Sequence, residues 1–212
     1  MKHTIKFLLL LTIFIFNGCQ GLIETNVNLS DLQNPTKKQI SGDLYIQVAA
    51  CNDFSDSRKV SDSVMQSKQT IPSIFKDAQF VECFQKEFIS YSHFTIPILI
   101  SDKTSSDYIN IISNKDNLLN VSVPPSIKQN IDRVKANSYG MTDIDLSVSI
   151  NFNNDTNKKL SFYAISSYIG DTPAIYNNFF VEPNHEFTIK LSDVSVDNAL
   201  INGESSVLIY DK

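Results

Sequence analysis

Apolar and polar residues alternate along several stretches of this chain, and a period of two is the pattern of a half-buried β-strand. The alternation is visible in residues 23–29 and cleanest in residues 144–152, which end in the turn Asn153-Asn154-Asp155. Further strands are predicted for residues 43–50, 78–90, 93–101, 108–113, 118–123, 160–169, 174–181, 187–191 and 207–210.

One segment has a clear helical pattern. In residues 126–136, which follow two prolines, Ile127, Ile131 and Val134 fall on one face at the spacing i, i+4 and i+7. The same segment also reads as a linker between two halves of the chain. A shorter helix of one or two turns is predicted to begin at Thr70, after a polar loop that includes a short helix.

These elements predict an α+β, β-rich fold. A mixed N-terminal half, residues 19–123, would be followed by the helix or linker at 124–140. An antiparallel meander or sandwich-like half would then occupy residues 141–212, because short strands there are separated by turn residues.

The first eighteen residues have the pattern of a signal peptide. Lys2 and Lys6 precede an apolar run that ends near Phe16, and Gly18-Cys19 follows. The apolar run is too short for a transmembrane helix, which needs about 20 residues. A buried core helix would need neither the lysines nor the cysteine. We therefore expect residues 1–18 to be removed on export.

The Gly18-Cys19 pair makes this segment resemble a bacterial lipoprotein signal, whose cysteine is acylated with fatty acids such as palmitate. Phe16 and Asn17 depart from the leucine and the small residue that such signals usually carry. Gln20 implies sorting to the outer membrane, since the usual retention signal is aspartate. Two or more acyl chains would hold Cys19 at the membrane stably, because each buried methylene contributes about 0.8 kcal/mol.

The two remaining cysteines predict a disulfide. Acylation would use Cys19, and Cys51 and Cys83 would then be one pair in an oxidising compartment. A reactive or metal-binding thiol is the alternative, but the sequence has no CxxC and the nearest histidine, His93, lies ten residues from Cys83.

Charge excludes some partners. The full chain has a formal net charge of −5, and removal of Lys2 and Lys6 leaves 16 basic and 23 acidic residues, a net charge of −7. The basic residues do not cluster, so we expect neither nucleic acid nor direct attraction to anionic lipid headgroups. Tryptophan is absent, which makes the chain a poor candidate for sugar stacking, although it has eight tyrosines.

The known motifs of catalysis, phosphate binding and calcium binding are absent from the sequence. His93 is interpreted as a structural or surface histidine. His185 has carboxylates on both sides and could be a weak metal ligand, but a turn between two strands explains it as well. We predict no catalytic, cofactor-binding or metal-binding residues.

Two groups of carboxylates remain as alternatives. The acidic patch at Asp53, Asp56 and Asp62 suits a solvated loop better than a Ca²⁺ site, which needs six to eight oxygens. Asp143 and Asp145 lie on one face of a predicted strand and could act as the carboxylate pair of a glycosidase. Surface alternation explains them more simply.

The N-terminal half resembles a known group of proteins. The resemblance covers roughly residues 19–100 and rests on Cys19, residues 23–32, residues 50–58 around Cys51 and residues 75–83. The group consists of small lipoproteins of bacteria, prophages and plasmids that are catalogued as a domain of unknown function. The resemblance implies a lipid-anchored domain with the Cys51–Cys83 pair and no known activity.

Two functional hypotheses follow. We predict a non-enzymatic lipoprotein of the cell envelope, held through acylated Cys19 in the outer membrane, where it would face the periplasm or the cell surface. Its partner would be an envelope protein or a lipid. The alternative is an envelope hydrolase that uses Asp143 and Asp145, or the region around Asp53, as its carboxylates.

Overall fold

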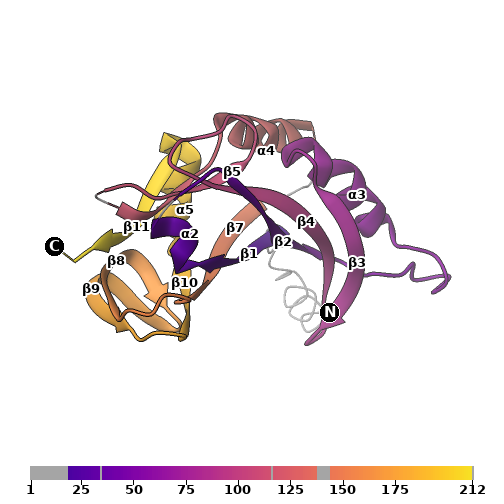
Figure 1. Cartoon of the computed structure of the whole chain (residues 1–212). Helices are drawn as coiled ribbons and strands as arrows, with labels where there is room; N and C mark the ends of the chain where they lie inside the picture. Colours follow the sequence, from indigo (N-terminus) through magenta and orange to yellow (C-terminus); the bar gives the residue numbers. More distant parts are fainter. Residues whose placement is uncertain (1–18, 34, 116, 138–143, 212) are drawn as a thin grey trace, which may run out of the picture.

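The computed structural model describes residues 19–33, 35–115, 117–137 and 144–211 (Figure 1). Four helices in these residues are α2 (Leu29–Gln33), α3 (Asp62–Ile74), α4 (Pro125–Asn137) and α5 (Asp193–Asn202). The strands are β1 (Cys19–Asn28), β2 (Lys38–Val48), β3 (Gln79–Lys86), β4 (Ile89–Ser101), β5 (Ile109–Ile112), β6 (Asn117–Ser122), β7 (Ile144–Asn153), β8 (Leu160–Ile169), β9 (Thr172–Val181), β10 (Glu186–Leu191) and β11 (Glu204–Tyr210).

All eleven strands belong to one sheet, which closes on itself. The strand order is β10-β7-β1-β2-β4-β5-β6-β11-β8-β9, and β3 pairs with β4. Strand β8 pairs with β11 near Ala164 and with β10 near Ser167. Nine strands therefore form a closed barrel, with β3 and β9 outside it. Most neighbours are antiparallel, but β1–β7 and β4–β5 are parallel.

The predicted α+β fold with a mixed N-terminal half is wrong. About 52% of the described residues are strand and 22% are helix, so this part of the protein is mostly β. Strands from both halves share one barrel, because β1 pairs with β7 and β6 pairs with β11. The alternating pattern identifies strands, but it does not reveal which strands pair across more than one hundred residues.

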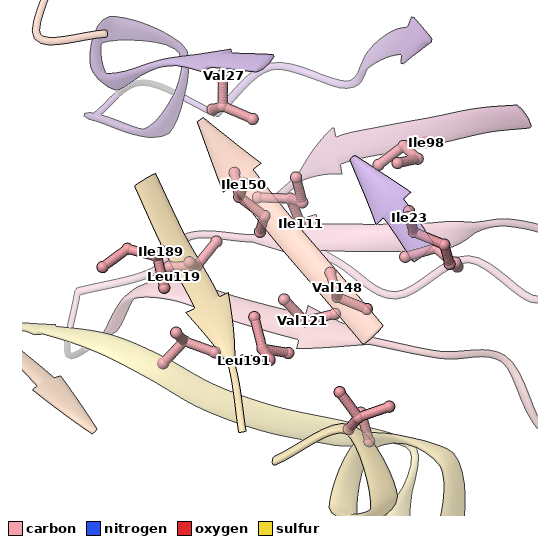
Figure 2. Close-up of a cluster of buried hydrophobic side chains, with 14 of the residues drawn as sticks. Ile23, Val27, Ile98, Ile111, Leu119, Val121, Val148, Ile150, Ile189 and Leu191 are labelled. Atoms are coloured by element: carbon pink, nitrogen blue, oxygen red, sulfur yellow. The ribbon is translucent and has the colours of Figure 1, made fainter. Parts of the chain in front are cut away.

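The barrel interior is the hydrophobic core. Alternate residues of β1 point inward, and its Ile23 and Val27 face side chains from β4, β5, β6, β7 and β10 (Figure 2). Each buried aliphatic side chain contributes about 1.5–3 kcal/mol relative to an exposed one. The inward residues labelled in the figure are Ile23, Val27, Ile98, Ile111, Leu119, Val121, Val148, Ile150, Ile189 and Leu191.

Helix α4 covers the segment for which a helix was predicted, and Ile127 and Ile131 are buried as its pattern indicates. Helix α3 is longer than predicted and begins eight residues before Thr70, where the Ser61 hydroxyl accepts a hydrogen bond from the Val64 N–H. Its Ser67 hydroxyl donates to Ser92 of β4 at 2.9 Å. Helix α3 therefore packs on the inward face of β4.

Cys51 and Cys83 form a disulfide with a Cα–Cα distance of 5.5 Å. The bond joins the loop after β2 to β3, which lies outside the barrel. It is therefore a covalent link between this outer strand and the loop that follows β2, a strand of the ring.

Replacing both Cys51 and Cys83 with serine is expected to lower the free energy of unfolding by about 3–4 kcal/mol, because the cross-link restricts the unfolded chain. Urea unfolding of the mature protein in mild detergent measures this difference. Dithiothreitol should lower the wild-type midpoint to that of the double variant and leave the double variant unchanged. A wild-type midpoint that is insensitive to the reductant would contradict the prediction.

Candidate functional site

A groove of about 410 Å³ lies on the outer face of the barrel and crosses five strands. Strands β7, β1, β2 and β4 form its floor, and β3 adds residues from outside the ring. Its lining consists of Gln20, Gly21, Leu22, Glu24, Tyr45, Phe84, Lys86, Tyr91, Asp145 and Ser147.

Strand alternation places these side chains outside the barrel. On β1, Ile23 is buried in the interior and Leu22 on the opposite face is half-buried. Leu22 lies opposite Tyr45 of β2, and Tyr45 lies opposite His93 of β4. Residues from three neighbouring strands therefore form one row across the outer face.

Four rings, from Tyr45, Phe84, Tyr91 and His93, form what we call the aromatic cluster. Tyr45 stacks on His93 with ring centroids 4.8 Å apart and meets Phe84 edge-on at 5.9 Å. Phe84 in turn stacks on Tyr91 at 5.7 Å. Each such pair contributes about 0.5–1.5 kcal/mol beyond its buried area, so the cluster is a rigid apolar surface.

Carboxylates surround this cluster. Burial first, and then the negative charges of Asp43, Glu24 and Glu82, raise the pKa of Tyr45 above its usual value. The Tyr45 hydroxyl therefore stays protonated at neutral pH and is available as a hydrogen-bond donor. His93 Nε2 lies 2.8 Å from Asp43 Oδ1, which orients the imidazole ring beneath Tyr45.

The groove therefore combines an aromatic surface with charged side chains at its margin. Glu24 and Asp145 provide hydrogen-bond acceptors, and Lys86 provides a cation. Such a surface suits a ligand or a protein segment that has an apolar body and polar ends. Within the described ranges, no group of three or more His, Cys, Asp or Glu residues is arranged to hold a metal ion.

The predicted lipidation site lies beside this groove. Cys19 is the first residue of β1, and the next three residues line the groove. Asp145, one member of the predicted carboxylate pair, is exposed and also lines it. Asp143, the other member, lies outside the residues that the structure describes, as do residues 1–18.

The structure does not bring the other candidate residues into the groove. Asp53 accepts hydrogen bonds from Ser55 and from the Asp56 N–H, which lower the pKa of its carboxyl group. Asp56 binds Arg58 in the same loop, at 2.9 Å. Asp62 is in the first turn of α3. His185 lies in the turn between β9 and β10.

Sequence reasoning missed the aromatic residues of the groove. Tyr45 and Tyr91 occupy outward positions of strands whose alternate residues are buried. An aromatic residue at a position that the alternation assigns to solvent is the signal that would have identified them. In the part of the chain that is described, no helix is apolar and long enough to cross a bilayer.

Comparison with known proteins identifies a family without an assigned function. The family model described as a domain of unknown function (DUF7424) matches residues 21–212. This match extends over both halves of the chain, beyond the N-terminal half that carried the resemblance. Neither a curated protein nor a solved structure matches the chain.

Proposed function

The chain belongs to the DUF7424 family, a domain of unknown function, and we propose that it is a non-enzymatic binding lipoprotein of the bacterial cell envelope. Acylated Cys19 would anchor it in the outer membrane, facing the periplasm or the cell surface. Its binding site would be the groove that contains the aromatic cluster. An association with prophages or plasmids remains part of this proposal.

The observation that carries the proposal is the position of the groove next to the anchor. Gln20, Gly21 and Leu22 follow Cys19 directly and line the groove. A strand rises about 3.3 Å per residue, so these residues lie within roughly 10 Å of Cys19 along β1. When Cys19 is acylated, the groove is held close to the membrane surface.

A groove this close to the membrane surface favours a partner in the same membrane. The aromatic cluster would contact an apolar or aromatic side chain, and Lys86, Glu24 and Asp145 would pair with polar groups at its edge. We therefore expect the partner to be an outer-membrane protein. The Cys51–Cys83 disulfide supports the same oxidising compartment.

Replacing Phe84 or Tyr91 with alanine is expected to weaken partner binding about 30-fold or more, because a central aromatic residue contributes 2 kcal/mol or more to a typical interface. Chemical cross-linking in intact cells, followed by purification of the lipid-anchored protein and mass spectrometry, measures the recovered partner. The wild-type protein should recover one specific envelope protein, and each variant should lose most of it.

Tyr176→Ala is the matched control. Tyr176 is an exposed aromatic residue on β9, outside the ring, and does not line the groove. This variant should recover the partner as the wild-type protein does. If Tyr91→Ala and the wild type recovered the partner equally, the groove would not be the binding site. If the wild type recovered no specific partner, the binding function itself would be contradicted.

A further inference from the structure

Strand register places Cys19 at the same end of the sheet as the β3–β4 hairpin tip. Gly21 pairs with Ile46, so Cys19 is level with Val48, and Val48 pairs with Ser90 of β4. The tip residues Glu87 and Phe88 extend beyond this level, since β4 begins at Ile89. Strand β4 is two strands from β1, which is about 10 Å across the sheet.

The aromatic side chain of Phe88, at the hairpin tip, is exposed to solvent. Phe88 is 97% exposed, and Ile89 next to it is 36% exposed. Both Glu87 and Phe88 have positive φ angles, 50° and 68°, which are unfavourable for residues with large side chains. The turn therefore projects a phenyl ring into solvent at a strained backbone position, although an asparagine or glycine would fit the turn better.

The loop after β2 leaves the sheet at this end too. Strand β2 runs antiparallel to β1 and ends at Val48, so the following loop begins beside Cys19. This loop contains Phe54, whose side chain is fully exposed. Its attachment to β3 through Cys51 and Cys83 limits how far it can move from the hairpin.

We propose that this end of the barrel faces the bilayer and that Phe88 inserts into the membrane interface. The inference rests on the proposed anchor, because β1 begins at Cys19 itself and leaves no linker between the acylated residue and the folded domain. The domain cannot swing away from a bilayer that holds Cys19. The chain end, the hairpin tip and the loop with Phe54 are then brought to the same surface.

The residues of the β3–β4 hairpin tip suit a contact with the membrane interface. Lys86 and Glu87 balance each other in charge, so attraction to anionic headgroups does not drive the contact. Burial of the phenyl ring is favourable in proportion to its apolar area, and aromatic side chains are enriched at membrane interfaces. Insertion of Phe88 would therefore orient the barrel and hold the groove beside the membrane.

The absence of tryptophan from the chain allows a direct test. In the acylated F88W protein, reconstituted into phosphatidylcholine vesicles, the single indole should emit at shorter wavelength than in detergent-free buffer. Vesicles with brominated acyl chains should quench most of this emission. Tryptophan-free wild-type protein gives the background, and urea unfolding checks that the variant is folded.

Q39W is the matched control. Gln39 is exposed on β2, nine residues from Val48, which places it about 30 Å from the anchored end. Its emission should remain unquenched in the same vesicles. Equal emission from F88W and Q39W, in protein that floats with the vesicles, would overturn the membrane-facing orientation and leave the anchor intact. Protein that does not float with the vesicles would refute the anchor, and the orientation with it.

Discussion

Cys19→Ala is expected to abolish acylation and with it the stable attachment of the protein to the membrane. One acyl chain gives only reversible binding, with an association constant of about 10⁴ M⁻¹, whereas two or more chains hold a protein at a membrane stably. Metabolic labelling with palmitate should give a labelled wild-type protein and an unlabelled variant. Mass spectrometry of the N-terminal peptide should locate the lipid on Cys19.

A second form of the protein distinguishes membrane attachment through the lipid from attachment through the apolar signal segment. If residues 1–19 are exchanged for an ordinary cleavable signal peptide, the exported protein begins at Gln20 and has neither the lipid nor the apolar run. It should appear in the soluble fraction of the periplasm. Membrane attachment that persists in this form after a high-salt wash would show that Cys19 is not the anchor.

The positions of most strands could be predicted from the sequence, because inward and outward residues alternate in them. Residues 144–152 were predicted as a strand and lie within β7, and the same holds for residues 160–169 and β8. What alternation cannot provide is the partner of each strand. The parallel pair of β1 and β7 is set by closure of the barrel, which depends on the summed twist and register of all its strands.

Errors at strand ends have local physical causes. The sequence predicted one strand over residues 78–90, but the chain turns at Glu87 and Phe88, which are not residues that favour a turn. Strand β2 begins at Lys38, although the predicted strand began after Gly42. Glycine fits at position 42 within that strand, because a Cβ there would lie 2.5 Å from Ile98 Cδ1 and the Ile98 side chain would have to shift.

Helix α5 was not predicted from the sequence, although capping residues mark both of its ends. Ser192 caps the first turn by accepting from the Ser195 N–H, and Gly203 has a φ of 90° at the C-terminal end. Both residue types are preferred at these positions. Half of its residues are apolar, but Val194 and Ile201 are exposed, so the apolar positions do not mark one buried helical face.

The candidate groove was less predictable than the strands. Tyr45, Phe84 and Tyr91 come from three strands, and their contacts follow from strand pairing that the sequence does not reveal. The prediction for Cys19 rests on local context alone, since a signal segment is a contiguous pattern, and it stays a prediction. The contiguous alternation of a strand can be read from the sequence, whereas a surface assembled across several strands cannot.

Phe94→Ala is expected to lower the free energy of unfolding by about 3–5 kcal/mol, a large part of the roughly 5–15 kcal/mol that a typical domain has. Phe94 of β4 is 0% exposed, lies opposite Leu44 and meets the Phe80 ring edge-on at 5.4 Å. Removing its ring leaves a cavity that the surrounding strands cannot fill, because each is held in the sheet. Urea unfolding of the lipid-free form that begins at Gln20, in buffer without detergent, measures the loss.

Phe88→Ala in the same β3–β4 hairpin is the matched control, because it removes the same ring from a position that is 97% exposed. A surface substitution of this kind changes the free energy of unfolding by about 0.5 kcal/mol or less. Both variants lose a phenylalanine ring, and they differ only in whether that ring was buried or exposed. If both variants unfolded at the same urea concentration, Phe94 would not be part of the buried core. A large difference between them is expected, because the inward face of β4 is part of the core and the hairpin tip is not.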